Sequence, residues 1–292
     1  MLYSIPTKSI SEHNRHKSGF PYTLGRLRGG FKILFPENFI CFIKFHTFAA
    51  HWETSRMKKI DFKSLILFEN NDYIVVNKPP YLSTLKDRHE AQNILDLARL
   101  YTTDAQMCHR LDKETSGCLV IAKNPEAYRN IAMQFESRKV DKVYHAVVDG
   151  IHEYENFLVD RSLAVTNKGV AKVNKEGKSA QTYFSSLKTY YSHTLLECKP
   201  ISGRMHQIRI HLSYLKSPIC GDELYGGKPL YLSALKRRFN LKMGTDELPI
   251  MQRVSLHAYS IAFLGNQGEK IEVTSPYPKD FEVLIKQLEK NR

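Results

Sequence analysis

One aspartate in this sequence lies where a carboxylate could do chemistry. Asp112 belongs to the segment HRLDKETSG (residues 109–117), with Arg110 two residues before it and Lys113 directly after it. The segment is polar, ends in glycine and leads into an apolar run, so we expect a loop that precedes a strand. Because opposite charges favour the ionised form, a carboxylate held there stays ionised and exposed. That state suits a nucleophile or an electrostatic stabiliser, whereas a general acid must hold its proton.

A second candidate segment fits either a helix or a strand. Its apolar residues alternate over 208–212 as in a strand, but those of 205–215 also share one face of a helix. Gly203 precedes this segment and Pro218 follows it, as at the ends of a helix. We therefore favour a helix over 204–215.

On that helix Arg209 falls inside the apolar stripe. A charge that faces inward must be paired, because an isolated buried charge is costly. We predict Asp112 as its partner, held by the guanidinium through two hydrogen bonds, with Asp222 as the alternative partner.

No metal site is predicted. His206 and His211 lie five residues apart and have no Glu between them, unlike a helical zinc pair, so we expect local hydrogen bonds or contact with a bound substrate. The cysteines form no CxxC pair, which argues against structural zinc and disulfides and fits a reducing compartment. Ser116 lacks a G-x-S-x-G context, so a hydrolase is disfavoured. The five cysteines are Cys41, Cys108, Cys118, Cys198 and Cys220.

The composition favours a globular protein with a polyanionic partner. Lys and Arg number 43 against 30 Asp and Glu, a formal net charge of +13, and nucleic acid is the commonest partner for such a charge. A basic protein without a specific partner is the alternative. No uncharged apolar run approaches the roughly 18 residues of a membrane span. The nearest run, 33–50, contains Pro36, Glu37 and Lys44 and begins too late for a signal peptide, so a cytoplasmic protein without membrane contact is expected.

The elements that must position these residues mix strands and helices without a regular βαβ rhythm, which predicts an α+β fold. Asn124 and Pro125 mark one helix start. Residues 228–250 read as a polar, basic insertion whose densest charge is 236–238. The predicted strands are 65–68, 73–76, 142–149, 181–188 and 193–199, and the predicted helices are 125–138, 204–215 and 280–290.

Residues 1–56 differ from the rest of the chain. They carry eight Lys and Arg against three Asp and Glu and show no sustained hydrophobic period. We expect a poorly structured extension, with Met57 as the true start, and a domain over 57–292. The alternative is a basic RNA-binding arm.

Three stretches together resemble the RluA-type pseudouridine synthases. HRLD-x-x-TSG (109–117) is similar to the family signature, and YIVVNKP (73–79) looks like its entry strand. GRMHQIRIHL (203–212), which runs on to PICGD-x-x-YG (218–226), is similar to its late helix and loop. KVYHA (142–146) also matches a family strand. The resemblance implies a single catalytic domain with a mixed, largely antiparallel sheet, flanking helices and a central cleft.

The resemblance also implies a reaction. Such enzymes break the N-glycosidic bond of a uridine in RNA, turn the base and rejoin it through carbon, with no cofactor or metal. Asp112 would be the nucleophilic carboxylate, oriented by Arg209. Tyr144 would stack on the uracil and is placed to take the C5 proton, and Arg110 would hold the flipped base out or grip a phosphate. Taken alone, Asp112 would be explained as a turn-forming residue.

Other cations are candidates for phosphate contact, and His206 is a further candidate for substrate binding. No S4-like RNA-binding pattern is present, and Tyr81 stands in the loop where the family usually has glycine. We expect a monomer that modifies ribosomal or transfer RNA. One alternative is a non-catalytic RNA-binding protein, and another is a carboxylate glycosidase, which would need a second acid facing Asp112. The phosphate-contact candidates are Lys78, Lys113, Arg204 and Lys236, Arg237 and Arg238.

Overall fold

The computed structural model describes residues 60–86, 92–166, 170–241 and 244–291. The expectations for residues 1–56 lie outside the described residues. Among the described residues, no helix combines the length and apolar character needed to cross a membrane.

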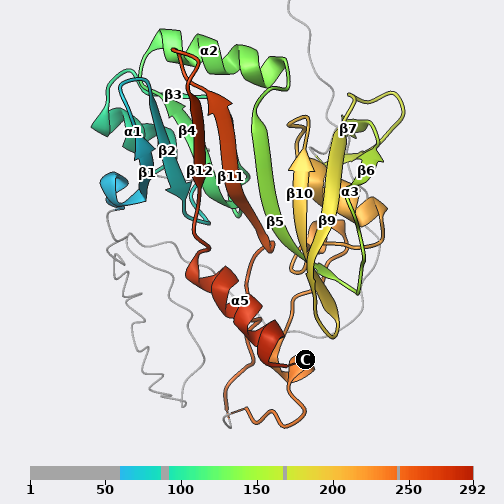
Figure 1. Ribbon diagram of the computed structural model, residues 1–292. Coiled ribbons are helices and arrows are strands. Elements are labelled where there is room, and N and C mark those ends of the chain that lie inside the picture. The colour runs from blue at the N-terminus through green and yellow to red at the C-terminus, as the bar shows by residue number, and fades with distance from the viewer. Residues whose placement is uncertain (1–59, 87–91, 167–169, 242–243, 292) are drawn as a thin grey trace, which may run out of the picture. The chain divides into compact units, whose positions relative to one another are not determined.

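One ten-stranded sheet organises this part of the chain (Figure 1). Eight strands follow the order β1-β2-β4-β11-β5-β10-β9-β6, while β3 pairs with β4 and β12 with β11. Only the contact between β4 and β11 is parallel, at Ser116 and Gly117, so the sheet is mixed and mostly antiparallel as predicted. Strands β7 and β8 form a separate pair.

The predicted strands are confirmed within a few residues. The strands are β1 (Ile66–Glu69), β2 (Tyr73–Lys78), β3 (Gln106–Met107), β4 (Ser116–Ala122), β5 (Asp141–Asp149), β6 (Phe157–Asp160), β7 (Leu163–Val165), β8 (Ala171–Val173), β9 (Gln181–Thr189), β10 (His193–Pro200), β11 (Leu256–Leu264) and β12 (Lys270–Thr274).

The predicted helices are also confirmed, although one begins late. The predicted helix 204–215 begins only at Gln207, because His206 has a left-handed backbone with φ of 54° and cannot join the helix. The helices are η1 (Phe62–Leu65), α1 (Ile94–Tyr101), α2 (Pro125–Glu136), α3 (Gln207–Tyr214), η2 (Glu223–Tyr225), α4 (Leu232–Leu235) and α5 (Lys279–Lys290), where η marks a 3₁₀ turn.

Each half of the sheet carries a helix on both faces. Helices α1 and α2 cover opposite faces of β2 and β4, because alternate strand residues such as Ile74 and Val75 belong to different cores. Helices α3 and α5 likewise cover opposite faces of β5 and β10, where Ala146 faces α3 and Val147 faces α5. Tyr144 packs against the cores of both α1 and α3, so these two helices share one face of the sheet.

The insertion 228–250 is less polar than predicted. Leu230 is buried and packs, with Leu235 and Ile250, against the core under α5. Many of the described residues between these anchors are exposed, including Lys236 and Arg238. Apolar contacts therefore anchor the insertion, and its basic residues are exposed to solvent.

Candidate active site

Asp112 lies on the loop between β3 and β4, and its neighbours fix that loop. Leu111 is buried in the core under α1, and the hydroxyl of Thr84 bonds both the amide and the carbonyl of Leu111, at 3.2 and 2.9 Å. The amide of Thr115 donates to the carbonyl of Asp112 at 3.1 Å and closes a turn. The Asp112 side chain is 30% exposed, so the loop presents it to solvent as the sequence predicted.

The far end of the motif is anchored from β11. A Cβ on Gly117 would lie 2.1 Å from the carbonyl oxygen of Ala258, so only glycine fits this approach. Buried Arg253 donates to the carbonyl of Glu114 at 2.8 Å and to the hydroxyl of Ser116 at 3.3 Å. These contacts fix residues 114–117, the end of HRLDKETSG, and thereby hold the loop that carries Asp112.

Glu114 does not face Asp112 across a substrate site. Its carboxylate accepts a hydrogen bond from the amide of Val254 at 3.2 Å, on the other side of the loop. The pair of facing acids that a glycosidase needs is therefore not formed by these two residues.

Arg209 points inward from α3 as predicted, but its main partner is Asp222. Its Nε and Nη2 each donate to one oxygen of Asp222 at 2.7 Å, and Asp222 is fully buried. Nη1 lies 3.6 Å from Oδ2 of Asp112. The prediction of a two-point grip on Asp112 is therefore wrong: the guanidinium grips Asp222 and turns its remaining nitrogen towards Asp112. Burial acts to lower the pKa of Arg209, but the hydrogen bonds and charge of Asp222, with the charge of Asp112, raise it overall.

His206 is the second cation-capable group beside Asp112. Its Nε2 lies 3.7 Å from Oδ2 of Asp112, and its Nδ1 bonds the hydroxyl of Tyr225 at 2.8 Å. Burial lowers the pKa of His206, so its ring is neutral at pH 7. Because a carboxylate faces Nε2, the ring proton is best placed there, with Tyr225 donating to Nδ1. The Tyr225 ring in turn lies 5.0 Å from the guanidinium of Arg209.

Tyr144 lies on β5 with small neighbours. Its partners on the flanking strands are Cys198 and Ala258. Burial, followed by the negative charge of Asp112, raises the pKa of the Tyr144 phenol above its ordinary value. The hydroxyl is therefore protonated at neutral pH and lies within electrostatic range of Asp112.

The cations predicted to contact RNA lie at the surface, with the exception of Lys78. Arg110 is exposed and borders a groove of about 370 Å³ shared with Arg99 and Tyr128. Arg204 is exposed and donates to the carbonyl of Ser179 at 3.3 Å. Neither observation tests their predicted contact with RNA.

The prediction that Lys78 contacts phosphate is wrong. Its side chain is fully buried, and its ammonium donates to the carbonyls of Pro79, Leu82 and Lys113 at 2.9–3.0 Å. Lys78 therefore holds the loop after β2 against the loop that carries Asp112. In the same loop Tyr81 has a φ of 64°, the left-handed backbone in which the family's usual glycine is favoured.

Three supporting residues were missed by the sequence reasoning. Arg253 could have been noticed as a lone charge before an apolar strand, and Tyr225 belonged to a segment already singled out. Thr84 gave no signal, because a threonine in a loop has no distinctive pattern.

Known proteins with similar sequences and structures identify the family and agree with the fold. The family model for RNA pseudouridylate synthase matches residues 72–214. The chain is 34% identical over 241 residues to the ribosomal large subunit pseudouridine synthase C of Buchnera aphidicola subsp. Baizongia pistaciae, across 78% of this chain and 72% of the relative. It is 31% identical over 233 residues to the ribosomal large subunit pseudouridine synthase D of Haemophilus ducreyi, across 76% and 70% of the two chains. The solved structure of human RNA pseudouridylate synthase domain containing 4 matches with a TM-score of 0.59 and 25% identity, over 78% of this chain and 95% of that one.

The chain belongs to the RNA pseudouridylate synthase family. Its relatives place it among the RluA-type members, isomerases that convert uridine in RNA to pseudouridine. The predicted family, fold class and reaction are thereby confirmed, and nothing favours the non-catalytic alternative.

Proposed function

We propose that this enzyme isomerises uridines in the RNA of the large ribosomal subunit, with Asp112 as the attacking carboxylate. Two similar relatives carry the names of ribosomal large subunit pseudouridine synthases C and D, which supports ribosomal RNA over transfer RNA. The net charge of +13 suits a long polyanionic substrate.

The state of the Asp112 carboxylate is the observation that carries this proposal. Among residues 60–86, 92–166, 170–241 and 244–291, no hydrogen bond reaches its oxygens, and its nearest charged partner is Arg209 at 3.6 Å. A carboxylate that is partly exposed and faced by a cation without being bonded to it keeps its lone pairs for attack.

The proposed reaction balances without any other reactant. The bond between N1 and C1′ breaks while Asp112 stabilises or captures the reacting carbon, and the freed uracil turns. A bond then forms between C5 and C1′, C5 loses its proton, and N1 gains one. The turning of the base must occur outside the helical stack, which costs a few kcal/mol of unstacking.

The remaining side chains have supporting roles in this proposal. Tyr144 stacks on the target base; its phenol, protonated at neutral pH, would have to give up its own proton before it could take the one that leaves C5. Arg209, fixed by Asp222, faces the Asp112 carboxylate and orients it. Arg110 holds the displaced nucleotide out, and exposed cations such as Lys113 and Arg204 contact phosphates.

The Asp112→Asn variant tests this assignment. We expect turnover to fall at least about 10⁴-fold, because an amide is a poor nucleophile, while RNA affinity changes little. Turnover is measured as tritium released from [5-³H]uridine-labelled RNA, and affinity by filter binding. Glu114→Gln is the matched control, since it makes the same chemical change two residues away and its amide oxygen can still accept from Val254. Undiminished tritium release by Asp112→Asn would refute the assignment.

The choice of substrate is tested separately. Labelled large-subunit ribosomal RNA and a pool of transfer RNA are offered to the wild-type enzyme, and pseudouridines are mapped in cells with and without the gene. Sites confined to transfer RNA would overturn the ribosomal proposal and leave the reaction intact.

We further propose a monomer that acts in the cytoplasm. The free thiols at Cys108, Cys118, Cys198 and Cys220 support a reducing compartment.

A further inference from the structure

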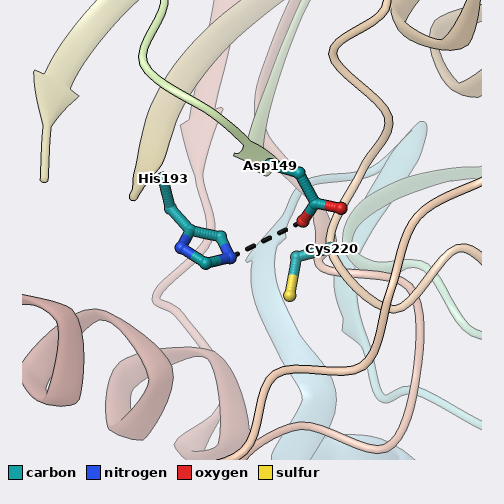
Figure 2. A group of neighbouring side chains, drawn as sticks. All are labelled: Asp149, His193 and Cys220. Carbon is teal, nitrogen blue, oxygen red and sulfur yellow. Dashed lines mark ion pairs between the residues drawn. The ribbon is translucent and has the colours of Figure 1, made fainter. Parts of the chain in front are cut away.

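Three potential metal ligands converge away from the catalytic carboxylate. Asp149 ends β5, His193 begins β10, and Cys220 lies in the turn after α3 (Figure 2). One donor atom from each lies within 4.8 Å of the other two, and His193 and Cys220 are buried. Oxygen, nitrogen and sulfur donors thus meet at one point inside the protein.

One oxygen of the Asp149 carboxylate at this point lacks the hydrogen-bond partner that its burial requires. Its Oδ1 atom is buried and accepts no hydrogen bond from any described residue. The nearest cation-capable atom, Nε2 of His193, is 3.5 Å away, which is longer than a good hydrogen bond of about 2.7–3.2 Å. Two ligands of a tetrahedral zinc ion, each about 2.0 Å from the metal, lie roughly 3.3 Å apart. The separation of Asp149 and His193 therefore fits two ligands of one ion better than a direct bond.

Hydrogen bonds position the His193 ring and the Asp149 carboxylate, whereas the Cys220 thiol donates to the carbonyl of Lys228 at 3.5 Å, a bond that metal binding would replace. Nδ1 of His193 bonds the hydroxyl of Ser192 at 2.8 Å, the outer contact that leaves Nε2 free to bind a metal. Oδ2 of Asp149 accepts from the amide of Lys228 at 3.3 Å. The amide of Cys220 donates to the carbonyl of Val147 at 2.9 Å and ties its turn to β5. These bonds reduce the ordering that a metal would otherwise have to impose.

We propose that Asp149, His193 and Cys220 bind one zinc-like divalent cation, with a fourth ligand from solvent. The thiolate and imidazole donors select a borderline metal such as Zn²⁺ and disfavour Mg²⁺ and Ca²⁺, which require oxygen ligands. This inference departs from the prediction of no metal. The three residues lie far apart in the sequence, so no spacing motif could reveal them.

The position of the site gives the metal a structural role. Cys220 is two residues before Asp222, the carboxylate that grips Arg209. Gly221 between them has a φ of 80°, and a Cβ there would lie 2.6 Å from the carbonyl oxygen of Arg253, so the turn has little freedom. A cation at Cys220 would fix this turn to the ends of β5 and β10, and through Asp222 it would steady Arg209 beside Asp112.

Zn²⁺ and Co²⁺ binding to the full-length chain tests the proposal. The protein is stripped with a chelator, kept reduced, and titrated with Zn²⁺ against a chromophoric chelator. We expect one high-affinity ion per chain, and with Co²⁺ a thiolate-to-metal charge-transfer band. Cys220→Ser should abolish the band, and Cys220→Ser, His193→Asn and Asp149→Asn should each weaken binding by roughly 100-fold or more.

Matched variants distinguish this site from other thiols. Cys108→Ser and Cys41→Ser should bind Zn²⁺ like the wild type and retain the Co²⁺ band. Zn²⁺ should also raise the melting temperature of the wild type and leave that of Asp149→Asn nearly unchanged. Circular dichroism checks that each variant is folded, and if Cys220→Ser is not, His193→Asn and Asp149→Asn decide. The proposal would be overturned if the wild type bound no stoichiometric Zn²⁺. It would also be overturned if Cys41→Ser lost Zn²⁺ binding while Cys220→Ser, His193→Asn and Asp149→Asn retained it.

Discussion

At the scale of single residues, the guanidinium of Arg209 is hydrogen-bonded to the carboxylate of Asp222 and faces the carboxylate of Asp112 without bonding to it. Arg209 places two nitrogens on Asp222 at 2.7 Å and leaves a third 3.6 Å from Asp112. The planar fork of arginine makes this division possible, because the two-point contact with Asp222 sets the plane in which the third nitrogen points. Asp222 is thus a positioning residue that acts on Asp112 through Arg209.

The Asp222→Asn variant should therefore lose both stability and turnover. It removes the charge that balances buried Arg209, and breaking such a pair from one side costs about 3 kcal/mol of unfolding free energy. With its orientation loosened, Arg209 should hold Asp112 less well, so kcat should fall more than RNA affinity. Urea unfolding and tritium-release kinetics measure the two effects.

A neighbouring acid provides the control for this variant. Glu223 is exposed and directly follows Asp222, so Glu223→Gln makes the same chemical change without touching Arg209. It should leave unfolding and kcat near wild type. Equal behaviour of the two variants would contradict the positioning role of Asp222.

The sequence predicts the part of the site that depends on helical geometry, which is the direction of the side chains on α3. The period of α3 correctly turned Arg209 inward, but the choice between Asp112 and Asp222 depends on distances between separate segments, which spacing does not fix. The burial of Lys78 was not predictable for a similar reason. Its ammonium donates to the backbone carbonyls of Pro79 and Leu82, and a sequence does not reveal which carbonyls need a side-chain donor.

At the scale of elements, a histidine side chain extends the pairing between β3 and β4. The backbone ladder ends soon after Met107, and Nε2 of His109 then accepts from the amide of Val120 at 3.0 Å. The His109 ring also lies 5.1 Å from that of Phe135 on α2. Burial, followed by the charge of Lys142, lowers the pKa of His109 to about 3. The neutral ring therefore anchors the strand that begins after the catalytic loop.

This anchor predicts a loss of stability in acid. Between the ordinary histidine pKa of about 6.5 and the folded value, the unfolded chain binds a proton at residue 109 that the folded chain does not. Unfolding free energy should therefore fall as pH drops below about 6.5, by up to about 2 kcal/mol from this residue at pH 5. Urea unfolding at pH 7 and pH 5 measures the change.

The His109→Gln variant isolates the contribution of this residue. Its amide oxygen can accept from Val120 and does not titrate, so its curve against pH should be flatter than that of the wild type. Some slope should remain, because burial also lowers the pKa of His145 and His257 to about 4. Parallel curves for the wild type and the variant would contradict the prediction.

Element boundaries were predictable where propensity and periodicity agree, and not elsewhere. The helix α2 begins at Pro125 behind the Asn124 cap, as its sequence indicates. The predicted start of α3 at residue 204 is too early, because His206 has a left-handed backbone that local propensity does not indicate. The sequence predicts a polar insertion over 228–250 because its few apolar anchors are scattered and show no period.

At the scale of the whole molecule, the excess of positive charge is the property that we expect to bind RNA outside the catalytic loop. The insertion displays three consecutive exposed cations, Lys236, Arg237 and Arg238, and α5 supports it through a shared core. A rigidly based cluster of this kind can contact several phosphates at once, so its contribution should appear in the salt dependence of binding.

Replacing Lys236, Arg237 and Arg238 together by serine should weaken RNA binding at every sequence and reduce its salt dependence. Each lost phosphate contact removes about 0.7–0.9 from the slope of log affinity against log salt, so the slope should fall by about 2–3 if all three contacts form. Fluorescence anisotropy with labelled ribosomal RNA fragments at several salt concentrations gives the slope. The control replaces three exposed cations elsewhere, Arg129, Lys139 and Lys270, and makes the same change in net charge. If both triple variants shift the slope equally, the charge acts diffusely and the insertion is not a contact surface; a larger shift for the insertion locates the RNA path along it.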